Sequence, residues 1–452
     1  MNLLTRVWAA SLLTLLAASW RLWLPDWNWL SAAGWTSDFP RVAMFTINPA
    51  LTPLLESFGL TTLLGGLLAT ASRRRPRAVE LGCVVVGLTA LWVTNQHRLQ
   101  PWAYQGWLYA AVFALASPPQ AKRALTVLTI SVYAYSSLGK FDQQFLRTVG
   151  PDFVRVLMPW LTPDSTTGRF GIAESAVLTL PLAELSIAVL LTIPRTRRWG
   201  GFAAITMHLL LLLVLGPLGL GHSTAVLIWN LFLAVQAWLL FVRRPHESAS
   251  PGEATAAIAD RSSPPPPAPK PESATDPLAT YRGYAVTLIV ITAVVLPLGE
   301  RLPAGRTDGY WDHWLSWALY SPHTSRVEIE VHGSQLASLS AEAGRHSRVG
   351  SDDDGWHELR IDRWSLAELA VPVYPQARFQ LGIAQKLAAQ LESPAAIRVK
   401  VRGISDRRSG QRRETWLLGT NEIDQECRHY WFLPKPSRKE NPINKSRRDN
   451  KQ

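Results

Sequence analysis

Two ionisable residues stand at the end of a long apolar stretch. The sequence SVYAYSSLGKFDQQFL, residues 131–146, places Lys140 and Asp142 directly after an apolar run. A lysine that is removed from water loses its proton more readily, so Lys140 could act as a general base. A lysine at a helix end can also extend its ammonium group to the membrane interface. Both interpretations of Lys140 stay open on the residue alone.

A second group of hydrogen-bonding residues follows an earlier apolar run. Residues 94–105 read TNQHRLQPWAYQ and include Asn95, Gln96 and His97. Side chains of these types offer directional donors and acceptors, and beside a membrane they could bind a polar ligand head or a quinone ring. A histidine in a short loop is more often simply solvated. The hypothesis therefore depends on the group and not on His97 by itself.

Other ionisable residues in the apolar runs have structural interpretations, and for Glu184 a role in a proton relay stays open as well. Glu184 lies deep in an apolar run, where a lone carboxylate is expected to be protonated or paired, and Arg21 is the candidate partner. We expect His208 to bond to a neighbouring helix and Asn230 to hold two helices together.

Three residues late in the chain have the side chains of metal ligands: Asp312, His313 and His323. The aromatic spacing around them instead favours a helix that lies on the membrane surface, so we expect no metal site. Three tryptophans would anchor this helix: Trp311, Trp314 and Trp317. The chain has two cysteines and no CxxC, which argues against a thiol–disulfide carrier or a cysteine-ligated zinc site. We find no nucleophile elbow, Walker loop or HExxH motif.

Long apolar runs must position all of these residues. Only 18% of the 452 residues are charged, and runs of about 18 to 22 apolar residues can cross a bilayer as helices. The fold class that we predict is an all-α polytopic membrane bundle of about nine transmembrane helices, with a small C-terminal α+β extramembrane domain. The nine candidate spans are 6–24, 51–71, 79–95, 103–117, 124–139, 173–194, 200–220, 223–242 and 282–299.

Basic residues gather in every second loop, at 73–77, 122–123, 195–198 and 243–244. Because cytoplasmic loops collect Lys and Arg, we predict a cytoplasmic N-terminus and an extracytoplasmic C-terminal domain in a cell (inner) membrane. These loops and the tail account for the net charge of +12, and no zinc-finger or helix-turn-helix pattern indicates a nucleic-acid partner.

Composition divides the chain into five parts. Alternation at 327–333 and 396–404 and in ETWLLGT predicts strands, and the spacing at 374–393 predicts a helix. The parts are an eight-helix membrane body at 1–244, a disordered cytoplasmic Pro-rich linker at 245–281, a ninth span at 282–299, an outward-facing α+β domain at 300–435 and a basic disordered tail at 436–452.

The stretch YAYSSLGKFDQQFLRTVG resembles a pattern in vitamin K-dependent γ-carboxylase and its bacterial relatives, the horizontally transferred transmembrane (HTTM) proteins. In that family an aromatic–small stretch precedes a lysine, an acidic residue, an aromatic residue and a glycine. Lys140, Asp142, Phe145 and Gly150 match this order. NQHRL likewise resembles the family's Asn/His-containing segment.

The resemblance implies a membrane enzyme that handles a quinol. Lys140 would be the base that deprotonates it, with His97 and Asn95 as catalytic helpers. Three further residues would contact the cofactor: Gln96, Asp142 and Tyr135. This hypothesis predicts a cavity between the third and fifth spans, lined by Asn95, His97 and Lys140.

Three alternatives stay open. The chain could be a transporter, for which Glu184 and the GPLGLG break at 216–221 are the features in favour. GKFDQQF also resembles a motif of the DoxX/MauE group of redox-associated membrane proteins. The chain could instead be a non-enzymatic, membrane-anchored protein for envelope assembly or binding. In every case the lipid bilayer is the expected partner, and an extracytoplasmic protein or lipid is the candidate substrate.

Overall fold

The computed structural model describes residues 1–158, 172–243, 277–301, 311–350 and 354–433. The predicted tail at 436–452 and most of the predicted linker at 245–281 lie outside the described residues. The last residues of that linker range already belong to helix α14.

The chain is mostly helical, and each of the nine predicted span ranges contains a helix within the described residues. These helices are α1 (Asn2–Ala18), α4 (Thr52–Ser72), α5 (Ala78–Thr94), α6 (Pro101–Leu115), α7 (Pro118–Lys140), α10 (Ile172–Thr192), α11 (Arg197–Leu215), α12 (Thr224–Ala237) and α14 (Pro277–Val295). Short elements connect them: α2 (Trp20–Trp23), α3 (Asn28–Ala32), η1 (Gln96–Arg98), α8 (Gln143–Arg147) and α9 (Val149–Leu157).

Five of these helices in the described chain are long and apolar enough to cross a membrane: α4, α10, α11, α12 with its π-helical end, and α14 with the turn that follows it. Nine spans are therefore not confirmed. Helices α1 and α5 are apolar but have 17 residues each, and α6 has 15. At a rise of 1.5 Å per residue, 17 residues reach about 25 Å, less than the hydrocarbon core of about 30 Å.

Small residues let the first helices of the body pack closely. A Cβ atom on Gly87 of α5 would lie 2.7 Å from the backbone oxygen of Gly59 in α4, and one on Gly66 would lie 2.5 Å from the oxygen of Glu80. Close backbone approach at such positions is how membrane helices gain contact without a hydrophobic driving force.

The C-terminal part folds around a five-stranded antiparallel sheet in the order β2-β3-β1-β4-β5. Its strands are β1 (Arg326–His332), β2 (Ser347–Val349), β3 (Trp356–Leu359), β4 (Ile397–Arg402) and β5 (Glu414–Leu418). One face is covered by helices, including α16 (Ile361–Leu369), α17 (Ala377–Ala388) and α18 (Gly419–Cys427). We refer to this unit as the sheet domain.

Burial alternates along the central strands of the sheet domain. In β1, Val327, Ile329 and Val331 are buried on the face against α17. The residues between them point to the other face, where Glu328 and Glu330 pair with arginines of β4. This is the pattern of an antiparallel sheet that is covered on one side. Strands β1, β4 and β5 and helix α17 lie where the sequence predicts them, whereas β2 and β3 are too short to show alternation.

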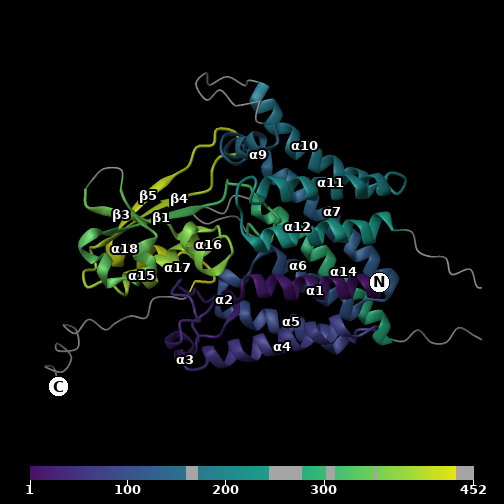
Figure 1. Ribbon diagram of the computed structural model, residues 1–452, viewed down its shortest axis with the longest axis horizontal. Helices are drawn as coiled ribbons and strands as arrows, with labels where there is room; N and C mark the ends of the chain where they lie inside the picture. Colours follow the sequence, from purple (N-terminus) through teal and green to yellow (C-terminus); the bar gives the residue numbers. More distant parts are fainter. Residues whose placement is uncertain (159–171, 244–276, 302–310, 351–353, 434–452) are drawn as a thin grey trace, which may run out of the picture.

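The sheet domain sits at one end of the helical body, and the N-terminus lies at the opposite end (Figure 1). Segment 311–325 joins the two parts, and it contains turns instead of the predicted membrane-surface helix. Trp314 and Trp317 are buried, and the Trp317 ring lies 5.1 Å from that of Tyr104 in α6. Trp317 and Tyr320 have a φ of 57°, a left-handed conformation that interrupts a helix. Trp314 and Trp317 thus pack inside the protein and do not anchor a helix at the membrane surface.

Candidate functional site

Lys140 ends α7 in a buried ion pair. Its Nζ lies 2.5 Å from Oε2 of Glu184 in α10 and 2.7 Å from Oγ of Ser136, one helical turn earlier. The two charged side chains are 8% and 11% exposed, so each is the counterion that the other needs away from water. The predicted pairing of Glu184 with Arg21 is wrong. Arg21 lies over the ring of Trp20, whereas Glu184 faces Lys140 because α7 and α10 pack together.

His97 is packed against the sheet domain and is not solvated. Its Nε2 lies 3.1 Å from the backbone oxygen of Pro372, and its ring contacts those of Phe39 and Phe379. Because a carbonyl oxygen only accepts, Nε2 carries the hydrogen. The lone pair of Nδ1 has no hydrogen-bond partner among the described residues. Burial lowers the pKa of His97 to about 4, so the ring is neutral at pH 7.

Asn95 supports the turn that carries His97. Its side chain accepts a hydrogen bond of 3.1 Å from the backbone N–H of His97, which caps η1. No hydrogen bond or ion pair joins Asn95 or His97 to Lys140 in the part of the chain that the structure describes. The predicted helpers and the predicted base therefore contact different elements.

Gln96 also contacts the sheet domain, through hydrogen bonds of its side-chain amide. Its Oε1 accepts a 3.0 Å hydrogen bond from Nε of Arg378 in α17, and its Nε2 donates to the backbone oxygen of Phe432. Arg378 also forms an ion pair of 3.1 Å with Asp312, which accepts from the hydroxyl of Tyr374. Gln96 thus positions a charged group that lines a cavity.

A cavity of about 860 Å³ lies between the helical body and the sheet domain. Apolar and aromatic side chains dominate its wall, and Asp312, Gln376 and Arg378 supply polar groups. Leu288 of α14 is 65% exposed, which shows that the cavity wall is open along this helix. The lining residues are Met44, Trp92, Leu99, Tyr104, Trp107, Leu108, Leu288, Ile289, Thr292, Ala293, Trp311, Asp312, Leu315, Gln376, Arg378, Tyr430, Trp431 and Phe432.

The cavity differs from the predicted one. It lies along α5, α6 and α14, whereas the prediction placed it between the third and fifth spans, which are α5 and α7. Asn95, His97 and Lys140 are not among its lining residues. The difference arises because α14, far along the chain, packs between α6 and α7.

The remaining predicted cofactor contacts have structural roles. Asp142 accepts hydrogen bonds from the backbone N–H groups of Gln144 and Phe145, which caps α8. Burial raises the pKa of the Asp142 carboxyl above its usual range. The Tyr135 hydroxyl donates to the backbone oxygen of Val294 and so joins α7 to α14.

The polar wall of the cavity carries no local sequence signal. Arg378 is separated by 282 positions from Gln96 and by 66 from Asp312, the two residues that hold it. The predicted interhelical roles of His208 and Asn230 do agree with the contacts. His208 Nδ1 lies 3.0 Å from Asn230 Oδ1, and its Nε2 lies 2.8 Å from the hydroxyl of Tyr133.

No family model, no curated protein and no solved structure matches this chain.

Proposed function

We propose that this membrane protein binds a lipid-soluble, ring-bearing ligand of the quinol class in the cavity between the helical body and the sheet domain. The cavity itself carries the proposal. Small-molecule sites commonly have volumes of about 300–1,000 Å³, apolar walls and a few polar groups that orient the ligand. A cavity of about 860 Å³ with this kind of wall fits that description.

The aromatic and charged side chains that line the cavity favour a ligand with a planar ring and polar substituents. Trp92, Tyr104 and Trp107 offer flat aromatic surfaces, which pack well against a planar ring. The guanidinium of Arg378 can donate to a ring oxygen, and the carboxylate of Asp312 can accept from a ring hydroxyl. Because α14 is long and apolar enough to span a membrane, a ligand dissolved in the bilayer can enter along it.

The resemblance of residues 133–150 to HTTM proteins supports the same ligand class. We therefore propose that the chain is related to that family. Proton transfer by Lys140 is a separate proposal, because Lys140 does not line the cavity. Its ammonium must first lose a proton before it can act as a base, and the Glu184 carboxylate is the acceptor within reach.

The orientation in the membrane is also a proposal. Arg6 near the N-terminus donates to the backbone oxygen of Ala71, so the N-terminus and the basic 73–77 loop lie at the same end of the body. That end is opposite the sheet domain (Figure 1). The positive-inside rule then places the N-terminus in the cytoplasm and the sheet domain outside.

Filling the cavity tests the binding proposal. In purified protein in lipid nanodiscs, a short-chain quinone should bind saturably to wild type. Ala293→Phe introduces a phenyl group at a buried position of α14 that lines the cavity. We expect it to weaken binding about 5- to 150-fold, since overpacking a filled site costs about 1–3 kcal/mol.

Val295→Phe is the matched control, because Val295 is 52% exposed on the same helix and does not line the cavity. It should bind the quinone like wild type. Equal binding by both variants would place the ligand elsewhere. An absence of saturable binding to wild type would reject the proposal and favour a non-enzymatic role in assembly.

A further inference from the structure

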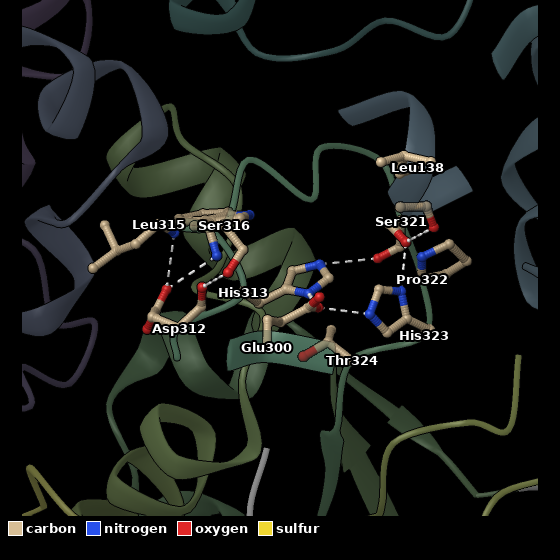
Figure 2. Close-up of polar contacts among 12 residues, drawn as sticks. Leu138, Glu300, Asp312, His313, Leu315, Ser316, Ser321, Pro322, His323 and Thr324 are labelled. Carbon is tan, nitrogen blue, oxygen red and sulfur yellow. Dashed lines mark hydrogen bonds and ion pairs between the residues drawn. The ribbon is translucent and has the colours of Figure 1, made fainter. Parts of the chain in front are cut away.

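Two histidines and a glutamate converge where α14 meets the sheet domain. Glu300 lies in the turn η3 (Leu296–Arg301) after α14, and His313 and His323 lie in the segment before β1. Oε1 of Glu300 is 2.9 Å from Nδ1 of His313 and 2.6 Å from Nε2 of His323, and each ring turns one nitrogen toward the carboxylate (Figure 2). The three side chains are 9%, 3% and 3% exposed, respectively.

Ser321 determines which ring nitrogens carry hydrogen. Nε2 of His313 lies 3.0 Å from the backbone oxygen of Ser321, which can only accept, so this nitrogen is the donor. The Ser321 hydroxyl gives its single hydrogen to the backbone oxygen of Gly139 at the end of α7. It must therefore accept from Nδ1 of His323, which lies 2.5 Å away (Figure 2).

The neutral rings consequently point lone pairs at a carboxylate. Nδ1 of His313, Nε2 of His323 and an oxygen of Glu300 all lie within 4.8 Å of one another. Three acceptors at this spacing repel one another, and the neighbouring guanidinium of Arg407 contacts His323 and Glu300 but not His313. Nη2 of Arg407 donates to Nε2 of His323 at 2.9 Å and lies 3.5 Å from Glu300, so a metal ion bound to His323 would have to displace this contact.

We propose that Glu300, His313 and His323 bind one divalent transition-metal ion, with Zn²⁺ the best match to the two nitrogens and one carboxylate oxygen. This donor set is the one that zinc and similar ions take with a further position left for water. Metal-bound histidines usually donate their other ring N–H to a fixed acceptor. Ser321 provides that acceptor for both rings, through its carbonyl oxygen and its hydroxyl.

This inference departs from the expectation of no metal site. Glu300 sits at the end of an apolar helix, 13 positions before His313, and nothing in the local sequence marks it as a ligand. Asp312, the acidic residue next to the histidines in sequence, is engaged with Arg378 instead. An ion here would join α14 to the segment before the sheet and, through Ser321, to α7.

Zinc binding to the full-length, purified protein tests the proposal. After treatment with a chelator, wild type should take up one Zn²⁺ per chain in competition with a chromophoric chelator. The double variant His313→Gln/His323→Gln should lose this uptake. His429→Gln is the control, because His429 is exposed and lies outside the group; it should bind zinc like wild type.

Two further variants separate metal binding from folding. Ser321→Ala keeps all three ligands but removes the hydroxyl acceptor, and we expect zinc affinity to fall about 10- to 100-fold. Arg407→Gln removes the neighbouring cation and should bind zinc at least as tightly as wild type. If chelator-treated wild type takes up no more zinc than the double histidine variant, then Arg407 alone balances the charge of Glu300 and the proposal is wrong.

Discussion

At the scale of single residues, the partner decides what a buried charge can do. Lys140 alone suggests either a base or an interfacial cation. Its contact with Glu184 in the interior of the helical body makes it half of a buried pair. Desolvation of such a pair is costly, and removal of one member leaves the other uncompensated. The pair is thus a structural requirement, whatever its role in proton transfer.

Substitutions at Lys140 can separate structure from proton transfer. Glu184→Gln should destabilise the protein by about 3–5 kcal/mol, and adding Lys140→Met should recover part of this loss. Lys140→Arg keeps the positive charge but gives up no proton near neutral pH. If Lys140 is a general base, Lys140→Arg should fold yet lose quinol-dependent redox activity in membranes.

The measurements are thermal unfolding in detergent and quinol oxidation in isolated membranes. Wild-type activity of both Lys140→Arg and Lys140→Met would exclude a general-base role. Unchanged stability of Glu184→Gln would instead show that the ion pair contributes little.

At the scale of elements, the NQHRL loop, residues 95–99, is a buried junction that joins several helices and is not an exposed ligand site. Arg98 is completely buried and donates to Oε1 of Glu56 in α4 at 2.6 Å. It also donates to the backbone oxygens of Leu22 and Leu24 and to the hydroxyl of Thr94. One guanidinium therefore joins α2, α4 and the end of α5. Arginine suits this place because its donors form a planar fork.

Arg98→Met should destabilise the protein by about 3–5 kcal/mol, because it leaves the Glu56 carboxylate without this buried partner. Arg73→Gln is the control. It removes a pair with Glu80 in which Arg73 is 46% exposed, and exposed pairs contribute about 0–1 kcal/mol. Thermal unfolding of the two purified variants in the same detergent checks the difference. Equal unfolding temperatures would contradict the junction role.

At the scale of the whole molecule, the basic loops and the position of the sheet domain favour the same orientation in the membrane. The sheet domain occupies one end of the helical body and the N-terminus the other (Figure 1). Contacts place the start of α11 near the end of α12, since a Cβ atom on Gly201 would lie 2.8 Å from Phe241. The basic residues at 195–198 and Arg243 therefore lie at the same end, as an alternating topology requires.

Cysteine labelling in intact cells tests this orientation in the membrane. Thr415→Cys places a thiol on the exposed edge strand β5 and should react with an impermeant maleimide from outside. Ser250→Cys, in the predicted cytoplasmic linker, should react only after the membrane is permeabilised. The unmodified chain sets the background, since Cys83 is half-buried and Cys427 buried. The reverse labelling pattern would invert the proposed orientation.

The local pattern of apolar residues was enough to predict much of the fold. Helices lie in all nine predicted ranges of the described chain, and β1 and β4 follow the alternation of their residues. Hydropathy and side-chain period act over a few turns or residues, so they are readable without the fold. The same information predicted that Glu184, deep in an apolar run, would be protonated or paired.

Only the tertiary structure decided which groups meet. Glu184 lies 44 positions from Lys140, Arg378 lies 282 from Gln96, and Glu300 joins two histidines from the segment before β1. Each pairing depends on which faces of distant elements pack together, and that choice follows from the shape and burial of the whole molecule. The cavity between the helical body and the sheet domain has the same origin, because its wall is assembled from α5, α6, α14 and the sheet domain.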